Sequence, residues 1–421
     1  MADLDRLLSV AAPTDQPWRT DPDRYWQAME EAVSERDSPV AAISLPALRY
    51  NIADLTRRAD GVPLRIASKS LRVRPIIDAL VRMKTVVGVL AYDLAEAIWL
   101  ATDHTDRPGI DDVLLGYPST NRGAIADLCA NPQALQRVTV LIDSIAHLDL
   151  IDTVCAPDAR EPVRIAIDLD ASLRLPALGD LGVLRSPIHT VQEAVSLART
   201  VVGRRGFRLV GVMSYEAQVA GVGNDVPGKA LENNMIRAMQ NVSMREVRSR
   251  RQKVIKQIRN LTHLEMVNAG GTGSIEETAR DHSITDIAVG SGFFGGHLFD
   301  NYRHFSPAPA LGFGLAVVRK PRHDVVTCHG GGWIASGPPA LDRLPQVVWP
   351  AGLEYQSREA AGEVQTPLRG DAARRLQIGD RVWFRHTKSG ELSEHLDTIA
   401  LIDQGYLDDV ATYRGEGKAF L

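Results

Sequence analysis

The sequence has few of the features that mark secreted, membrane-spanning or metal-ribbon proteins. It contains three cysteines among 421 residues, an odd and widely spaced set that predicts neither a disulfide framework nor a zinc ribbon. No apolar run approaches the roughly 20 residues that a membrane helix requires. The acidic, proline-interrupted first residues do not resemble a signal peptide. We therefore expect a soluble protein of the cytoplasm, a reducing compartment, with no membrane contact.

A surplus of positive charge is also absent. The 48 Lys and Arg residues are outnumbered by 52 Asp and Glu residues, which leaves a net charge of −4. Nucleic-acid-binding proteins usually carry a clear basic surplus, so we expect no nucleic-acid partner. The composition is 44% hydrophobic, which over this length is enough to bury a large core in two or three domains.

What the chain does contain is a regular alternation of short apolar runs and amphipathic helical stretches. Strands that alternate with helices predict parallel βαβ units. The count of such units is eight, the number that closes a (β/α)8 TIM barrel. The runs that we expect to form the strands are 64–67, 86–90, 113–115, 138–142, 163–167, 209–213, 264–267 and 287–289.

Changes in pattern divide the chain into three parts. Residues 1–38 are polar and predict a helical extension, residues 39–308 hold the barrel units, and residues 309–421 carry β-type patterns. The strand near Val40 either begins the barrel or joins the C-terminal β domain. The expected fold class is therefore α/β, a TIM barrel followed by a β domain.

Two local patterns refine this organisation. Gly379-Asp380 and Ser389-Gly390 are typical of turns between strands of the β domain. The basic run between residues 215 and 265 predicts a long helix. We interpret its charges as a solvated face rather than a binding site.

The active site of such a barrel lies at the carboxyl ends of its strands, and a lysine follows the first of them. Lys69 stands in the run Ala67-Ser68-Lys69-Ser70. An amine near the apolar floor of a barrel loses hydration, which favours the neutral, nucleophilic form that makes a Schiff base with an aldehyde. Taken alone, the residue is more simply explained as a lysine that extends its ammonium group into water at a strand end.

Two glycine-rich loops follow the seventh and eighth strands. Glycines let successive backbone N–H groups turn toward an anion, and loops at these two exits form the usual phosphate site of the fold. A phosphate site that faces a lysine across the barrel mouth predicts a phosphorylated aldehyde cofactor, pyridoxal 5′-phosphate (PLP). The residues that we expect to bind the phosphate are Gly270, Gly271, Thr272, Gly273, Gly290 and Ser291, with Ser274 as a further hydroxyl donor.

Other strand exits supply polar candidates for the cofactor ring. Tyr215 follows the sixth strand and has the planar side chain needed to stack on a ring or to hydrogen-bond beside it. Arg174 follows the fifth strand, where it either stabilises a phenolate oxygen of the cofactor or forms an ion pair with Asp168 or Asp170. Tyr117, after the third strand, is more simply explained as an aromatic residue of the rim than as a catalytic group.

Together these residues resemble the D-threonine aldolase / D-serine dehydratase family, a branch of the alanine-racemase-like PLP enzymes of fold type III. The resemblance runs from about Val40 to the C-terminus. Its best marks are ASKS around Lys69, VMSYE around Tyr215, and the NAGGTGS and VGSG loops. It implies that Lys69 forms the Schiff base and that both glycine-rich loops hold the cofactor phosphate. It also implies a homodimer, in which the β domain of one subunit approaches the active site of the other.

The sequence departs from this family in two places. Members usually carry a His-containing run before the lysine, where this chain has Arg65-Ile-Ala-Ser. Many also carry a metal-binding His-x-Cys or His-x-Asp in the β domain. Here His386 keeps the first position, but the cation Lys388 stands where the second ligand belongs. We therefore name no metal ligands and expect Lys388 to bind a substrate carboxylate, while the nearby polar residues are more simply explained as surface charges (Glu391, Glu394 and His395).

The resemblance implies a PLP-dependent lyase that acts on a D-configured β-hydroxy amino acid, by aldol cleavage or by dehydration. Lys69 would serve as the general base and the cofactor ring as an electron sink. Three alternatives remain. The first is an amino-acid racemase, for which Tyr355 is the nearest candidate second base. The second is a non-catalytic PLP-binding protein, which the added β domain disfavours. The third is a phosphosugar barrel in which Lys69 takes no covalent part.

Overall fold

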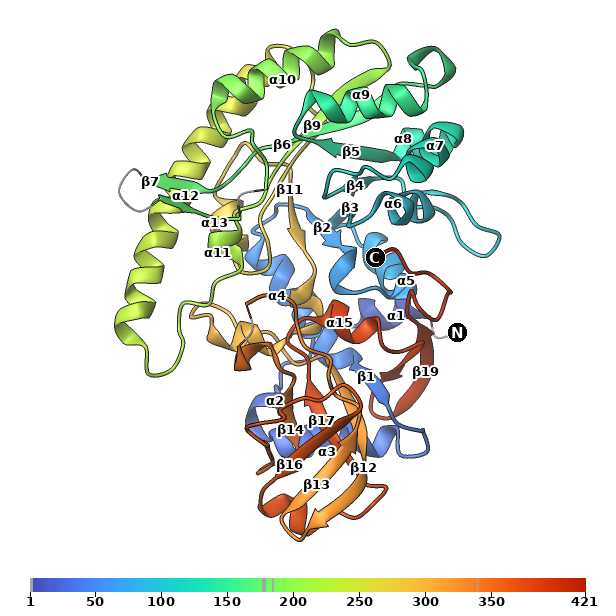
Figure 1. The fold of residues 1–421 in the computed structure, drawn as a ribbon, viewed down its shortest axis with the longest axis vertical. Coiled ribbons are helices and arrows are strands. Elements are labelled where there is room, and N and C mark those ends of the chain that lie inside the picture. Colours follow the sequence, from blue (N-terminus) through green and yellow to red (C-terminus); the bar gives the residue numbers. More distant parts are fainter. Residues whose placement is uncertain (1–2, 176–178, 184, 339) are drawn as a thin grey trace.

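The computed structural model describes residues 3–175, 179–183, 185–338 and 340–421. These residues form a closed barrel of eight parallel strands and a separate nine-stranded sheet. The two parts lie at opposite ends of the molecule (Figure 1). The predicted TIM barrel with a C-terminal β domain is confirmed.

The barrel strands coincide with the apolar runs of the sequence. Around the closed ring they are ordered β10-β11-β2-β3-β4-β5-β6-β9, so consecutive βαβ units are neighbours, as expected for right-handed crossovers. Their bounds are β2 (Leu64–Ala67), β3 (Val86–Ala91), β4 (Val113–Leu115), β5 (Val138–Ile142), β6 (Val163–Asp168), β9 (Phe207–Ser214), β10 (Met266–Ala269) and β11 (Asp286–Val289).

Helices cover the outside of the barrel, and several begin at a side chain that caps their first N–H groups. Asp93 caps α6, and Thr190 forms a capping box with Glu193 at α10. The helices are α4 (Leu45–Arg58), α5 (Arg74–Val81), α6 (Leu94–Ala101), α7 (Arg122–Ala130), α8 (Pro132–Arg137), α9 (Ile145–Val154), α10 (Val191–Gly203), α11 (Ala217–Ala220), α12 (Ala230–Arg259), α13 (Ile275–Ala279) and α14 (Ser291–Phe294). A two-stranded hairpin, β7 (Leu173–Leu175) with β8 (Gly179–Leu181), follows β6.

The strand near Val40 lies in the β domain. This strand, β1 (Val40–Ser44), pairs antiparallel with β12 and parallel with β18, and Ser44 then caps α4. The chain therefore passes from the β domain into the barrel and back. The other elements of the domain are β12 (Leu311–Arg322), β13 (Val325–His329), β14 (Gln346–Trp349), β15 (Glu354–Tyr355), β16 (Gln365–Arg369), β17 (Arg381–Arg385), α15 (Ser389–Ser393), β18 (Thr398–Ile402) and β19 (Tyr406–Ala411).

Three helices precede β1, namely α1 (Leu4–Ser9), α2 (Pro17–Thr20) and α3 (Pro22–Ala32). The carboxylate of Glu30 in α3 accepts hydrogen bonds from Arg381 and from the indole of Trp383, both in β17. At the other end of this segment, α1 packs against α4 and α5 of the barrel. The N-terminal helices therefore contact both parts of the molecule.

Side chains that point into the barrel form layers, because successive residues of a strand alternate between its two faces. The middle layer is apolar and contains Leu90, Leu114, Leu141, Ala166, Met213 and Met266. Below it, Arg65 bonds the carboxylates of Asp112 and Asp286. The next inward positions above the middle layer face the mouth where the active site is expected.

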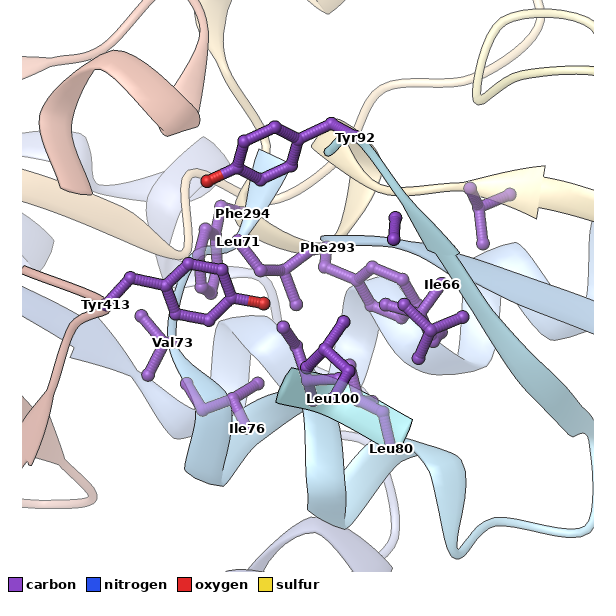
Figure 2. Packing of buried hydrophobic residues seen from close by; sticks show 14 of the residues in the cluster. Ile66, Leu71, Val73, Ile76, Leu80, Tyr92, Leu100, Phe293, Phe294 and Tyr413 are labelled. Carbon is purple, nitrogen blue, oxygen red and sulfur yellow. The ribbon is translucent and has the colours of Figure 1, made fainter. Parts of the chain in front are cut away.

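Apolar packing also anchors the chain on both sides of the turn that carries Lys69. Figure 2 shows Ile66 and Leu71 packed with Phe293 and Phe294 of α14 and with Tyr413 near the C-terminus. All five side chains are almost completely buried.

Among the described helices, none is both long and apolar enough to cross a membrane.

One turn prediction is wrong. Gly379 has the positive φ of a turn, 101°, but Ser389-Gly390 begins the short helix α15 instead of a turn. This helix contacts the turn of Lys69, and the contact with the barrel, which a local pattern cannot reveal, explains the difference.

Candidate active site at the barrel mouth

Lys69 lies in a single 3-10 turn, Ser68–Ser70, directly after β2. The turn carries the side chain beyond the strand end, so the residue is exposed rather than dehydrated on the barrel floor as we expected. Its Nζ donates a hydrogen bond to the Tyr117 hydroxyl at 2.9 Å. The amine is therefore available at the mouth and held by one defined partner.

The β domain fixes the backbone of this turn. Arg72 adopts a positive φ of 53°, and its Nε donates to the carbonyl of Lys69 at 3.1 Å. Ser393 of α15 donates to the carbonyl of Leu71 at 2.9 Å. Gly390 lies so close that a Cβ there would be 2.3 Å from the Lys69 carbonyl oxygen. Only glycine permits this approach, so α15 positions the lysine from behind.

Tyr117 is more than an aromatic residue of the rim. Burial alone would raise the pKa of its phenol, but the positive charges of Lys69 and Arg185 outweigh that effect and hold the pKa below its ordinary value. The guanidinium of Arg185 lies 5.7 Å from the centre of the Tyr117 ring and 6.0 Å from that of Tyr215. Arg185, which the sequence analysis missed, therefore contributes charge to the same site.

The two glycine-rich loops contact each other, as two adjacent barrel exits should. The N–H of Gly292 donates to the Thr272 hydroxyl at 3.2 Å. Within the described ranges, no group accepts a hydrogen bond from the backbone N–H of Thr272, Gly273 or Ser291. These N–H groups remain available to an anion at the mouth.

A buried ionic cluster supports the first loop from below. The Glu216 carboxylate accepts from the N–H of Gly270 and the hydroxyl of Ser274, both at 3.3 Å. Arg251 of α12 lies 3.6 Å from Glu216 and 2.9 Å from Asp281, and these three charged side chains are fully buried. The Ser274 hydroxyl thus faces inward rather than toward a ligand. The solvated interpretation of the α12 charges is wrong for Arg251.

Tyr215 follows β9 and lies against the first loop. A Cβ at Gly271 would come within 3.0 Å of the Tyr215 ring, so the loop needs glycine to pack here. Burial raises the pKa of Tyr215 to about 12, despite the opposing charge of Arg185. The residue is therefore a neutral phenol at neutral pH, with an aromatic face next to the loops.

Arg174 has the ion pair that was one of its two predicted roles. It lies in β7, its side chain is 43% exposed, and its guanidinium lies 3.4 Å from the Asp170 carboxylate. Asp170 also accepts from Ser172 and interacts with His189 at 3.0 Å. The guanidinium that lies near the rings of Tyr117 and Tyr215 is that of Arg185, not that of Arg174.

These features fit a phosphorylated aldehyde. The N–H groups of the two loops that have no partner among the described residues suit a phosphate, the Lys69 amine suits an aldehyde, and Tyr215 offers an aromatic face beside the first loop. All four groups come from strand exits that are consecutive in the ring, those of β9, β10, β11 and β2. The geometry therefore fits a phosphorylated aldehyde such as PLP on one side of the barrel mouth.

The comparisons with solved structures agree on the architecture. The structure of D-threonine aldolase from Filomicrobium marinum matches with a TM-score of 0.73 and 16% identity over 91% of this chain and 96% of that one. D-threo-3-hydroxyaspartate dehydratase from Delftia sp. HT23 gives 0.69 and 18%, over 91% and 99%. Alanine racemase from Clostridium difficile 630 gives 0.57 and 14%, over 89% and 99%. No family model and no curated protein sequence matches the chain.

The chain has the alanine-racemase-like fold. The resemblance that the motifs suggested is therefore confirmed for the fold. The match covers nearly all of the aldolase and dehydratase structures.

The metal site that the resemblance implies is not matched by the residues of this alanine-racemase-like chain. His386 is buried, with Nδ1 facing the Leu311 carbonyl at 3.1 Å, and its Nε2 has no hydrogen-bond partner among the described residues. Lys388 donates to the carbonyl of Ser336 at 2.6 Å and to its hydroxyl at 3.1 Å. Among the described residues no three His, Cys, Asp or Glu side chains are arranged to hold a metal ion. A cation in the ligand position does not suit a divalent metal.

Several site residues escaped the sequence analysis. Arg185 lies in an irregular loop without a motif. Glu216 belongs to the VMSYE motif, which gave no indication of its role beneath the loop. Asp143 was not considered, although Ile142-Asp143 and Ile167-Asp168 repeat the same ending at two consecutive barrel strands. That repetition was the available signal, because residues that end adjacent parallel strands lie side by side.

Proposed function

We propose that the chain is a PLP-dependent lyase that acts on a D-configured β-hydroxy amino acid. The single observation that carries the proposal is the placement of the exposed Lys69 amine beside two linked loops whose N–H groups at Thr272, Gly273 and Ser291 are unpaired. PLP, when bound, supplies an electron sink for a carbanion at the substrate Cα. Aldol cleavage and dehydration are the two reactions proposed.

Within this proposal the protein residues hold the reacting groups and move protons. Lys69 accepts a proton at Nζ as general base. Tyr117 accepts a hydrogen bond from that amine and, with its lowered pKa, can share the proton. Tyr215 remains protonated and would offer its aromatic face to the cofactor ring. The glycine-rich loops bind the phosphate and so fix the distance between ring and lysine.

A racemase is the second candidate, because alanine racemases share the fold. That reaction needs a second base on the other side of the cofactor. Tyr355, the candidate in the β domain, donates its phenol hydrogen to the carbonyl of Pro345 at 2.7 Å. Burial raises its pKa well above the ordinary value. A phenol with a raised pKa stays protonated at neutral pH and so cannot accept a proton there, and we therefore favour the lyase.

Lys388 supports a substrate with a negative charge. Burial lowers its pKa, and the nearby charges of Arg343 and Lys69 lower it further, so three cations share one region of a protein with a net charge of −4. An anion relieves this repulsion. We propose that Lys388 binds a substrate carboxylate, where a divalent metal would bind in related enzymes.

The product of the reaction tests the proposal. Purified protein with added PLP is incubated separately with D-threonine, D-threo-3-hydroxyaspartate, D-serine and D-alanine. Glycine with an aldehyde identifies an aldolase, and a keto acid with ammonia identifies a dehydratase. Formation of the L-isomer, or no product from any D-amino acid, would contradict the lyase. Lys69→Met is the matched control and should yield no product.

The same assay tests Lys388. If this residue binds a side-chain carboxylate, Lys388→Met should raise KM for D-threo-3-hydroxyaspartate at least tenfold more than KM for D-threonine, since one charge-assisted hydrogen bond contributes about 1.5–3 kcal/mol. Equal effects on both substrates would contradict this role. Lys84→Met, on the surface before β3, is the control.

A further inference from the structure

Two carboxylates at the barrel mouth have no role in the proposed reaction. Asp143 directly follows β5, and Asp168 is the last residue of β6. In the register of these neighbouring strands Leu141 faces Ala166 and Ile142 faces Ile167, so Asp143 and Asp168 are the next opposed pair. Leu141 and Ala166 point into the barrel. By alternation both carboxylates point inward as well, one layer nearer the mouth.

Asp168 is buried without a partner. It is 8% exposed, and among the described residues its carboxylate accepts no hydrogen bond and forms no ion pair. By contrast Asp170, two residues away, is held by Ser172, His189 and Arg174. Burying a carboxylate without a partner is costly unless it is protonated or meets a ligand. The side chain is therefore built to meet a group that is not part of the chain.

The ring order of the strands indicates which group this is. Lys69 follows β2, and in the closed ring of eight strands β6 lies four places from β2, directly opposite. In PLP the ring nitrogen is para to the carbon that carries the aldehyde. With the aldehyde at Lys69 and the phosphate at the loops after β10 and β11, the nitrogen would face across the mouth toward the end of β6.

We infer that Asp168, together with Asp143, is the protein partner of the pyridine nitrogen of PLP and keeps that nitrogen protonated. The inference rests on the proposed function. An Asp is one of the residues that bind this nitrogen in PLP enzymes. Asp168 would pass its proton to the ring nitrogen, and its carboxylate would then accept the N–H hydrogen bond, while the nearby charge of Asp143 favours the proton on Asp168 beforehand. No other bond is formed or broken.

The surroundings of Asp168 and Asp143 favour the protonated form of the Asp168 carboxyl group. Burial, and then the charge of Asp143, raise the pKa of Asp168 to about 7, while Arg185 opposes the shift and Asp170 adds to it. Burial also raises the pKa of Asp143, against the effect of His147, which lies 3.4 Å away. Two adjacent carboxylates do not both ionise readily. Lys69, Tyr117 and Tyr215 also face the mouth in the described part of the chain, and the phenol of Tyr215 stays neutral.

A protonated ring nitrogen would favour reactions that pass through a carbanion at the substrate Cα. It withdraws electrons from the ring and so stabilises a carbanion at the substrate Cα, which cleavage of Cα–Cβ or loss of a β-hydroxyl requires. The carboxylate pair would therefore be a positioning and proton-holding element that suits a lyase.

The first test is nitrogen-15 NMR of the wild-type protein loaded with PLP labelled at the ring nitrogen. We expect the chemical shift of a protonated pyridine at pH 7, and the shift of a neutral pyridine in Asp168→Asn. Asp149→Asn, an exposed carboxylate on α9 paired with Arg204, should match the wild type. A neutral nitrogen in the wild-type protein would overturn the inference, whatever the variants do.

The second test uses 1-deazapyridoxal phosphate, in which C–H replaces the ring nitrogen. Wild-type protein should bind PLP at least tenfold more tightly than the analogue, and Asp168→Ala should bind the two equally. A preference that persists in Asp168→Ala would assign the nitrogen to another residue and overturn the inference. If neither compound binds wild-type protein, the proposed function itself fails. If both bind and react with Lys69 but without a preference, only the inference fails.

Discussion

At the scale of single residues, the contact between Lys69 and Tyr117 determines the properties of the reactive amine. The lysine is exposed at the mouth. The Tyr117 hydroxyl lies 2.9 Å from its Nζ, and the Arg185 guanidinium lies 5.7 Å from the centre of the Tyr117 ring. The charge of Lys69 and its hydrogen bond, together with Arg185, hold the pKa of the Tyr117 phenol below its ordinary value.

A prediction for this contact concerns the titration of Tyr117. In Lys69→Met the phenol loses its nearest positive charge, so its pKa should rise. The measurement is the ultraviolet absorbance of phenolate against pH, with Tyr117→Phe subtracted to isolate the signal. An unchanged titration in Lys69→Met would show that the amine and the phenol do not interact.

At the scale of elements, the glycine-rich loop after β10 depends on a tight fit with its neighbours. A Cβ at Gly273 would lie 2.3 Å from the carbonyl oxygen of Ala220 in α11. Backbone cannot yield as a flexible side chain does, so a substitution must displace the loop. The unpaired N–H groups of Thr272 and Gly273 would move with it.

We therefore expect Gly273→Ala to weaken PLP binding at least tenfold, while the fold is retained. The comparison is Gly203→Ala at the end of α10, where a Cβ meets no atom within 4 Å. Equilibrium dialysis gives the affinities, and circular dichroism reports the fold. Equal affinities for the two variants would place the phosphate elsewhere.

The buried cluster beneath this loop gives a prediction about stability. Arg251→Met would leave the carboxylates of Glu216 and Asp281 without their shared cation in a fully buried site. Removing one member of a buried ion pair costs about 3–5 kcal/mol. Urea unfolding should show this loss for Arg251→Met, and a change within about 0.5 kcal/mol for Arg245→Met on the exposed side of the same helix. Similar stability of the two variants would contradict the assigned role.

At the scale of the whole molecule, a buried carboxyl group joins the barrel to the C-terminal segment. Glu96 in α6 is fully buried and accepts hydrogen bonds from the N–H of Tyr92 at 2.7 Å and from the Tyr413 hydroxyl at 2.9 Å. Burial raises its pKa from 4.5 to about 7, despite the hydrogen bonds that oppose the shift. The folded protein therefore binds this proton more tightly than the unfolded chain.

This difference makes stability depend on pH. Since the folded pKa lies above the unfolded one, the stabilising contribution is complete below pH 4.5 and is lost as the pH rises through about 7. The loss corresponds to about 3 kcal/mol. Glu96→Gln, which mimics the protonated acid, should remove this part of the dependence. The free energy of unfolding in urea, measured for both proteins between pH 4.5 and 8, checks it, and parallel curves would be contrary to the prediction.

The sequence predicted the fold better than the site. Eight apolar runs with helical spacers were sufficient for the barrel, because strand period and helix period are local properties. The same approach located Lys69 and both glycine-rich loops, since a barrel exit follows directly from the end of a strand. Arg185, Arg251 and α15 could not be found in this way. They reach the site across tens or hundreds of residues, through tertiary contacts that have no local pattern.

The central claim is that Lys69 carries PLP, and borohydride reduction tests it most directly. Protein incubated with PLP is reduced, digested and analysed by peptide mass spectrometry. We predict a pyridoxyl phosphate adduct on the peptide that contains Lys69, and none in protein that carries Lys69→Met. An adduct confined to another lysine such as Lys388, or no adduct at all, would contradict the account.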